Sequence, residues 1–252
     1  MEFLDPKPPP RLAGRYDRGY LPHLRAQGRS YFVTFRLHGT LPQEVLRQYQ
    51  AEREALLAKA RAAGAISRMG VFRAEGAPVR KPALPPAGKP AIRSSDIPLG
   101  EELSAEERRR LFELYSEKIE AYLDAGRGEC WLQEPRIGEL VAGALRFFHG
   151  QRYDLGPWVV MPNYVRVIIR PLRTHLLDEI VKSWKGFTAR EANKLLKKTG
   201  DSFWAREYYD HLVRDDQERA RLTDYVHDNP RKARLCAGWE DWPLSSAHPR
   251  WR

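Results

Sequence analysis

Residues 157–171 read PWVVMPNYVRVIIRP, two short apolar runs separated by the triplet Met161-Pro162-Asn163. Proline cannot donate a ladder hydrogen bond and asparagine favours turns, so this stretch predicts two strand segments joined by a turn or bulge. Upstream, residues 31–37 (YFVTFRL) alternate and are rich in β-branched and aromatic side chains. That pattern is typical of a strand.

The segments around these strands have helical patterns. The clearest carries apolar residues at i, i+3, i+4, i+7, i+8 and i+11, namely Ile137, Leu140, Val141, Ala144, Leu145 and Phe148. Further helices are predicted over 41–63, 105–126, 176–185, 188–198 and 217–228. Capping boxes mark two of the starts, Ser104/Glu107 before the second helix and Thr188/Glu191 at the fourth. Gly126, Gly186 and Asn229-Pro230 mark the ends of the second, third and fifth helices. Residues 202–215 are interpreted as an aromatic-rich connection. This order predicts an α+β fold with an antiparallel sheet covered by helices.

Composition limits the class of protein. The chain has 252 residues, of which 42% are hydrophobic and 30% charged, which fits a single folded domain spanning 1–252. Its longest apolar runs are too short to cross a membrane, and no signal-peptide pattern is visible at the start. Cys130 and Cys236 are its two cysteines and form no CxxC pair, which argues against a disulfide framework or a thiolate zinc site. We therefore expect a cytoplasmic protein.

The net charge of +10 is concentrated in particular segments. Residues 61–93 hold seven basic side chains and one acidic, and residues 161–200 hold nine basic and three acidic. The first block lies in a stretch rich in proline, glycine and alanine, so residues 64–100 are interpreted as a mobile basic linker inserted in the domain. The second block lies within patterned structure and could form a fixed surface for a polyanion.

Six blocks, in this order, resemble the REP-associated tyrosine transposases, relatives of the single-tyrosine HUH transposases. They are YFVTFRLHGTLP, VVMPNYVRVIIRPL, KSWKGFTAREANKLL, SFWAREYYDHLVRD, YVHDNPRKARL and DWPLSSA, and they cover most of residues 15–247 apart from the linker. The resemblance implies a ferredoxin-like fold that binds a DNA hairpin and the adjacent single strand. Family members cut that strand with a tyrosine hydroxyl and form a 5′-phosphotyrosine link.

The family's metal-binding pair is replaced in this chain. In the family, Met-Pro-Asn is followed by His, an apolar residue and a second His, and positions i and i+2 of a strand point the same way about 7 Å apart. Two imidazoles placed so can chelate Mg²⁺ or Mn²⁺ and polarise the scissile phosphate. Here the positions hold Tyr164 and Arg166. Arginine has no lone pair to donate and neutral tyrosine is a poor ligand, so we expect no metal cofactor.

The resemblance places the family's nucleophile at Tyr225, with Asn229 one helical turn later where relatives add a polar metal contact. A free phenol has a pKa of about 10, so about a thousandth is phenolate at pH 7. Arg166 stands where the metal would lie, and we consider two roles for it: a fixed cation that holds a backbone phosphate, or an ion-pair partner or solvent-facing residue. His211 and His227 are the alternative source of a rebuilt metal site.

A basic and aromatic surface is predicted for nucleic acid. Lys182 and Lys185 share one helix face, and Arg190, Lys194 and Lys198 follow at i+4 spacing. Arginine and histidine side chains then interleave with aromatic ones, which suits stacking on unpaired bases. The members of this second group are Arg206, Tyr209, His211 and Arg214.

Three functions stay open. The first is a transposase-derived protein, a monomer or homodimer, that binds hairpin or single-stranded DNA and cleaves it weakly or not at all. The second is an active metal-dependent tyrosine endonuclease. The third is a regulator that binds an RNA hairpin. Because the metal ligands are replaced while Tyr225 remains, the sequence leaves open whether the chain is an enzyme.

Overall fold

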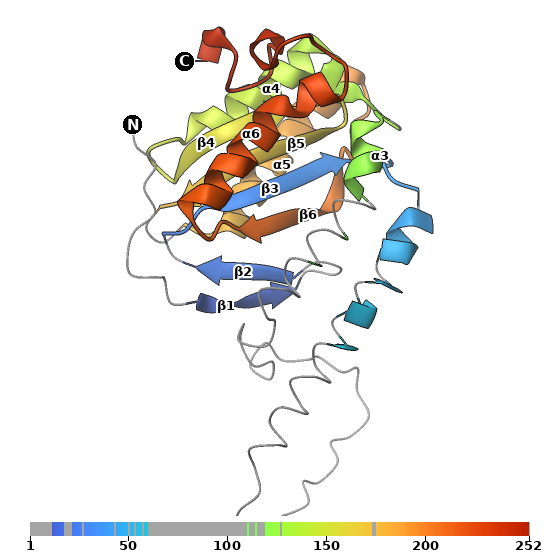
Figure 1. Cartoon of the computed structure of the whole chain (residues 1–252). Coiled ribbons are helices and arrows are strands. Elements are labelled where there is room, and N and C mark those ends of the chain that lie inside the picture. The colour runs from blue at the N-terminus through green and yellow to red at the C-terminus, as the bar shows by residue number, and fades with distance from the viewer. Residues whose placement is uncertain are drawn as a thin grey trace, which may run out of the picture.

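Four strands form an antiparallel sheet in the computed structural model, and two helices connect them (Figure 1). The strands are β3 (Tyr31–Leu37), β4 (Tyr153–Val160), β5 (Tyr164–Pro171) and β6 (Trp204–Leu212), in the order β4-β5-β3-β6. Helix α4 (Pro135–Phe147) links β3 to β4, and α5 (Leu177–Leu196) links β5 to β6. This βαββαβ order with antiparallel neighbours is the ferredoxin-like arrangement, so the expected α+β fold is confirmed.

The structure describes residues 28–42, 44–49, 51–52, 54–56, 58–59, 110, 114, 119–126, 128–172 and 175–251. It also gives the backbone of a separate hairpin, β1 (Leu12–Asp17) and β2 (Pro22–Ala26). The linker predicted over 64–100 and the capping pair Ser104 and Glu107 lie outside these residues. In the described part of the chain, no helix has the length and apolar character that crossing a membrane requires.

One face of the sheet carries the larger core. Successive strand residues point to opposite faces, so Val33 and Phe35 of β3 and Val167 of β5 all turn toward α4 and α5. The amphipathic face predicted for 137–148 packs there, with Ile137 and Leu145 fully buried. Helix α4 begins at Pro135, where the Glu134 side chain accepts the Ile137 N–H at 3.1 Å.

The opposite face is covered by α6 (Asp216–Lys232) and α3 (Ala121–Asp124), with helical residues of 44–59 beside them (Figure 1). Phe32, Ile168 and Val159 of the sheet pack against Leu222 and Val226 of α6. Helix α3 ends as predicted, because Gly126 takes a φ of 61° that suits glycine and its N–H bonds to the Leu123 carbonyl at 3.1 Å. This is the face on which Tyr225 lies.

Three predicted boundaries are wrong. Helix α5 runs unbroken through Gly186, because the buried Thr188 hydroxyl donates to the Trp184 carbonyl at 2.7 Å within the helix and does not cap a new one. Residues 204–212 form strand β6 instead of a connection, since they pair with β3 at the sheet edge. Helix α6 continues through Asn229-Pro230 to Lys232.

Glu218 joins β6 to the start of α6 and gives a pH-dependent prediction. Its carboxylate is buried and contacts His211 Nε2 at 3.0 Å and Arg214 Nη2 at 2.7 Å. Burial alone would raise the pKa of Glu218, but the hydrogen bonds from His211 and Arg214 hold it well below its usual range. A carboxyl with a depressed folded pKa stabilises the protein above its unfolded pKa, near 4.3, and loses that contribution as pH falls toward the folded pKa.

We therefore expect Glu218→Gln to lower the free energy of unfolding by about 1–3 kcal/mol at pH 7. The difference from the unmodified chain should shrink as the pH falls below about 4. Urea unfolding curves between pH 7 and pH 3 measure it. Asp216→Asn is the control, because Asp216 is exposed and pairs only at the surface with Arg219. A Glu218→Gln penalty that stays constant with pH would contradict the assignment.

Candidate functional site

Strand β5 turns two polar side chains toward α6. Tyr164 and Arg166 alternate with apolar neighbours that face the other core, and both are fully buried. The preceding turn is held by Asn163, whose Nδ2 donates to the Leu123 carbonyl at 3.1 Å and whose carbonyl accepts the Leu37 N–H at 2.9 Å. The turn residue thus sets the position of the pair against both α3 and β3.

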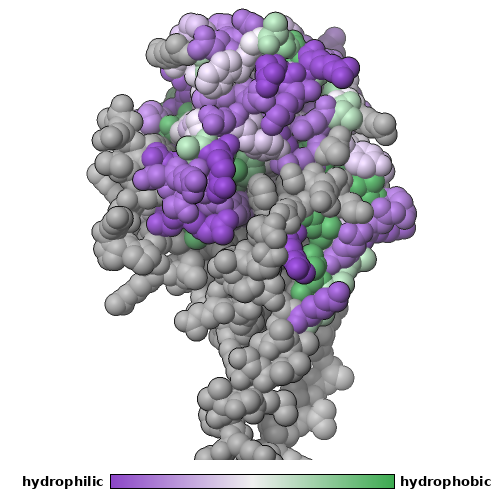
Figure 2. Space-filling view, viewed as in Figure 1, coloured by the Kyte–Doolittle hydropathy of each residue, from purple (hydrophilic) through white to green (hydrophobic). Residues whose placement is uncertain are grey.

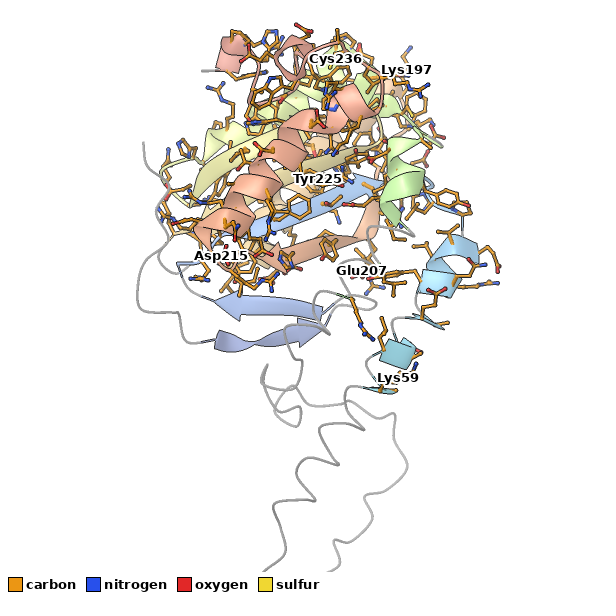
Figure 3. The ribbon with its side chains drawn as sticks, viewed as in Figure 1. Lys59, Lys197, Glu207, Asp215, Tyr225 and Cys236 are labelled. Carbon is orange, nitrogen blue, oxygen red and sulfur yellow. The ribbon has the colours of Figure 1, made fainter. Side chains whose placement is uncertain are left out.

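Helix α6 carries Tyr225, which is labelled in Figure 3, and Asn229 one helical turn later, and both residues contact this pair. Arg166 Nη1 donates to Asn229 Oδ1, and the Tyr164 hydroxyl oxygen lies 2.8 Å from the same atom. The Arg166 guanidinium carbon lies 4.7 Å from the centroid of the Tyr225 ring and 4.6 Å from that of Tyr164. Residues that are about 60 positions apart therefore meet, as the resemblance implied for a nucleophile and the metal-site positions.

Two carboxylates complete the cluster, and the sequence reasoning missed both. Glu120 Oε1 lies 3.0 Å from Arg166 Nη2, and Asp124 Oδ1 lies 3.4 Å from Arg166 Nη1 while accepting the Tyr164 hydroxyl. Their i, i+4 spacing on a predicted helix was the available signal, because it puts both on one helix face. Arg166 therefore pairs with carboxylates, which is the second of the two roles considered for it.

The cluster holds both phenols in the neutral form. Burial raises the pKa of Tyr225, and so does the Glu120 carboxylate to which it is hydrogen-bonded, against an opposing effect of Arg166. Burial likewise raises the pKa of Tyr164 well above its usual value, with Asp124 acting in the same direction. Burial alone would lower the pKa of Arg166, but the surrounding Tyr164 and Glu120 oxygens keep it raised. The site thus contains a permanent cation and unionised tyrosines.

These residues do not fit the divalent ion of the HUH family. The guanidinium of Arg166 cannot donate a lone pair, and Tyr164 and Asn229 are already hydrogen-bonded to it or to Asp124. Over the described residues, no group of three or more His, Cys, Asp or Glu is arranged to hold a metal ion. His211 contacts Glu218 and His227 contacts Ser246, so each has a structural partner.

The sheet separates the predicted cations of α5 from Tyr225. Lys182, Lys185, Arg190 and Lys194 lie on α5, which packs on the opposite face. Lys185 Nζ donates to the Ala205 and Arg206 carbonyls at 2.8 Å each, which ties α5 to β6. The predicted i+4 stripe ends early, because α5 stops at Leu196 and Lys198 Nζ lies 4.4 Å from the centroid of the Trp131 ring.

The residues predicted to bind nucleic acid differ in the exposure of their side chains. The Arg206 side chain is 91% exposed, and with Lys182 and Lys185 it lines a groove of about 370 Å³ between α5 and β6. Arg190 and Lys194 are exposed and both pair with Glu191. His211 and Arg214 bind Glu218, and Tyr209 packs against the core beneath α6.

The known proteins to which this chain is similar are all described as transposases. Residues 139–229, from within α4 to Asn229, match the family model described as "Transposase IS200 like". A protein of Haemophilus influenzae described as a REP-associated tyrosine transposase is 40% identical over 87 residues, which are 34% of this chain and 46% of that protein. The chain thus matches about half the length of this relative.

Two solved structures share low sequence identity with the chain. A REP-associated tyrosine transposase bound to a REP hairpin aligns over 92% of this chain and 81% of its own, with a TM-score of 0.41 and 13% identity. A protein described as a transposase from Deinococcus radiodurans aligns over 40% of this chain and 82% of its own, with a TM-score of 0.30 and 20% identity.

Proposed function

We propose that the chain is a member of the IS200-like transposases, whose family model matches residues 139–229, and that it binds a DNA hairpin with its adjoining single strand but has lost metal-dependent cleavage. The observation that carries this proposal is the buried Arg166 guanidinium between β5 and α6, at the position where the resemblance implies a divalent ion. Its charge is balanced by Glu120 and Asp124.

The state of Tyr225 supports the loss of cleavage. Attack on a phosphodiester needs the phenolate or a base that removes its proton, and a bound metal ion would supply the positive charge that stabilises the transition state. Here the pKa of Tyr225 is raised by burial and by Glu120. Arg166, the cation that lies between Tyr225 and β5, is fully buried and already paired with Glu120.

Retained binding is supported by the exposed cations outside this cluster. Lys182 and Arg206 line the groove between α5 and β6, and Arg190 lies further along α5. Lysine and arginine contacts to phosphates give an affinity that is independent of sequence and falls with salt. A hairpin stem offers phosphates at regular spacing for such a surface, whereas Tyr225 lies on the other face of the sheet.

A labelled DNA hairpin with a single-stranded flank tests both halves of the proposal. Fluorescence anisotropy should show binding, and the logarithm of the association constant should fall linearly with the logarithm of the salt concentration. Lys182→Gln with Arg206→Gln should reduce that slope by about one for each phosphate contact removed. With Mn²⁺ or Mg²⁺ present, denaturing gels should show no covalent adduct beyond that of Tyr225→Phe.

Other results would select the alternative functions. A metal-dependent adduct that disappears in Tyr225→Phe would identify an active endonuclease and contradict the loss of cleavage. Tighter binding of a matched RNA hairpin than of the DNA hairpin would favour an RNA-binding regulator. Absence of binding to either nucleic acid would overturn the proposal as a whole.

A further inference from the structure

The outer side of α6 forms a groove that shares Tyr225 with the cluster around Arg166. Its volume is about 610 Å³, within the usual range of ligand sites of about 300–1,000 Å³. It is lined by Arg221, Asp224, Tyr225, Asp228, Arg231 and Lys232 of α6, and by Trp239 of the short helix η3 (Trp239–Asp241). Hydrophilic side chains dominate the face that carries α6 (Figure 2).

Trp239 is an exposed aromatic side chain held in place from beneath. Its residue is 44% exposed, and its ring centroid lies 5.3 Å from that of His227, with the planes inclined at 57°. His227 is itself fixed by a 3.0 Å contact between Nε2 and Ser246 Oγ. The turn that carries Trp239 is closed by the Gly238 N–H, which donates to Asp241 Oδ2 at 2.7 Å. An aromatic ring held in this way can stack on an unpaired base.

Cations lie along the same groove next to the nucleophile position. Lys232 Nζ lies 5.2 Å from the centroid of the Tyr225 ring, and its side chain is 52% exposed. Arg221 is exposed one helical turn before Tyr225. Arg231 and Lys232 both pair with Asp228, at 2.5 Å and 3.6 Å respectively, so Lys232 is the more weakly held of the two. Lys232 and Arg221 are therefore the cations better placed to receive a phosphate.

We infer that this groove binds one nucleotide of the single strand that adjoins the hairpin, with the base stacked on Trp239 and its phosphate held by Arg221 and Lys232. The inference rests on the proposed function and adds a subsite to it. An aromatic ring combined with cations suits an unpaired nucleotide better than duplex DNA, because stacking needs a base face that pairing within a helix hides. Tyr225 lies in the wall of the same groove, so the bound strand would pass the position of the family's nucleophile.

Anisotropy with two hairpins of identical stem, one blunt and one with a single-stranded flank on either side, tests this subsite. We expect Trp239→Ala to weaken binding of a flanked hairpin about tenfold and to leave the blunt hairpin unchanged. Trp239→Phe should retain most of the affinity, because phenylalanine preserves an aromatic face. Arg221→Gln should weaken binding of the flanked hairpin and make that binding less dependent on salt concentration.

Phe147→Ala is the matched control, since Phe147 is an exposed aromatic residue, 72% accessible, at the end of α4. It should bind both hairpins as the unmodified chain does. Equal loss on both hairpins in Trp239→Ala, or no loss on either, would overturn the subsite while leaving hairpin binding intact. Failure of the unmodified chain to bind either hairpin would instead overturn the proposed function, and the subsite with it.

Discussion

Arg166→Met is expected to lower the free energy of unfolding by about 3–5 kcal/mol, the usual penalty for removing one partner of a buried ion pair. The guanidinium is fully buried and lies 3.0 Å from the Glu120 carboxylate, which is also buried. Without Arg166 that carboxylate either keeps a charge with no compensating cation or takes up a proton. Urea unfolding at pH 7 measures the loss.

A second substitution separates charge from packing. Arg166→Met combined with Glu120→Gln should recover at least half of the lost stability, because neither buried residue then carries a charge. Arg170→Met is the control on the same strand, since Arg170 is partly exposed and pairs with Asp154 at 2.6 Å. It should cost about 1 kcal/mol. A penalty for Arg166→Met no larger than that of Arg170→Met would show that the ion pair contributes little.

Tyr164→His with Arg166→His is expected to convert the cluster into a divalent-ion site. The two imidazoles would face α6 from alternate positions of β5, with the Asn229 amide oxygen and the Asp124 carboxylate close by. Mn²⁺ at one hundred times its dissociation constant should then stabilise the variant by about 2.7 kcal/mol. Thermal unfolding with and without Mn²⁺ measures this, and the unmodified chain should not respond.

The double-histidine variant should also form a Tyr225-dependent covalent adduct with a flanked DNA hairpin in Mn²⁺. Adding Tyr225→Phe should abolish the adduct without changing Mn²⁺ binding, which separates the nucleophile from the metal site. Arg166→His alone provides one imidazole and should bind Mn²⁺ more weakly. If the double variant binds Mn²⁺ but forms no adduct, two histidines at these positions are not sufficient for cleavage.

The elements that the sequence predicted correctly are those set by local patterns of residues. Periodicity predicted β3, the β4–turn–β5 hairpin around Met161-Pro162-Asn163 and helix α4, because strand alternation and helical spacing are local properties. The same periodicity put Tyr164 and Arg166 on one strand face, and Tyr225 and Asn229 on one helix face. The resemblance then indicated that these two faces meet, which the geometry confirms.

Packing decided what the local signals could not. Thr188 resembles a helix N-cap in the sequence, yet its hydroxyl is buried inside α5 and bonds to the preceding turn. The aromatic residues before Asp215 form an edge strand because their backbone pairs with that of β3. Propensity is a weak prior at such places, since burial and pairing partners determine the outcome.

From the sequence alone it follows that Tyr164 and Arg166 stand two positions apart after Met161-Pro162-Asn163, and that Asn229 follows Tyr225 by one helical turn, because identity and spacing are written in the residues. Only the tertiary structure decided the state of Arg166. Glu120 and Asp124 stand more than 40 positions before it and reach it because α3 packs against the end of β5. Electrostatic partners depend on distance in space, which a linear pattern of residues does not contain.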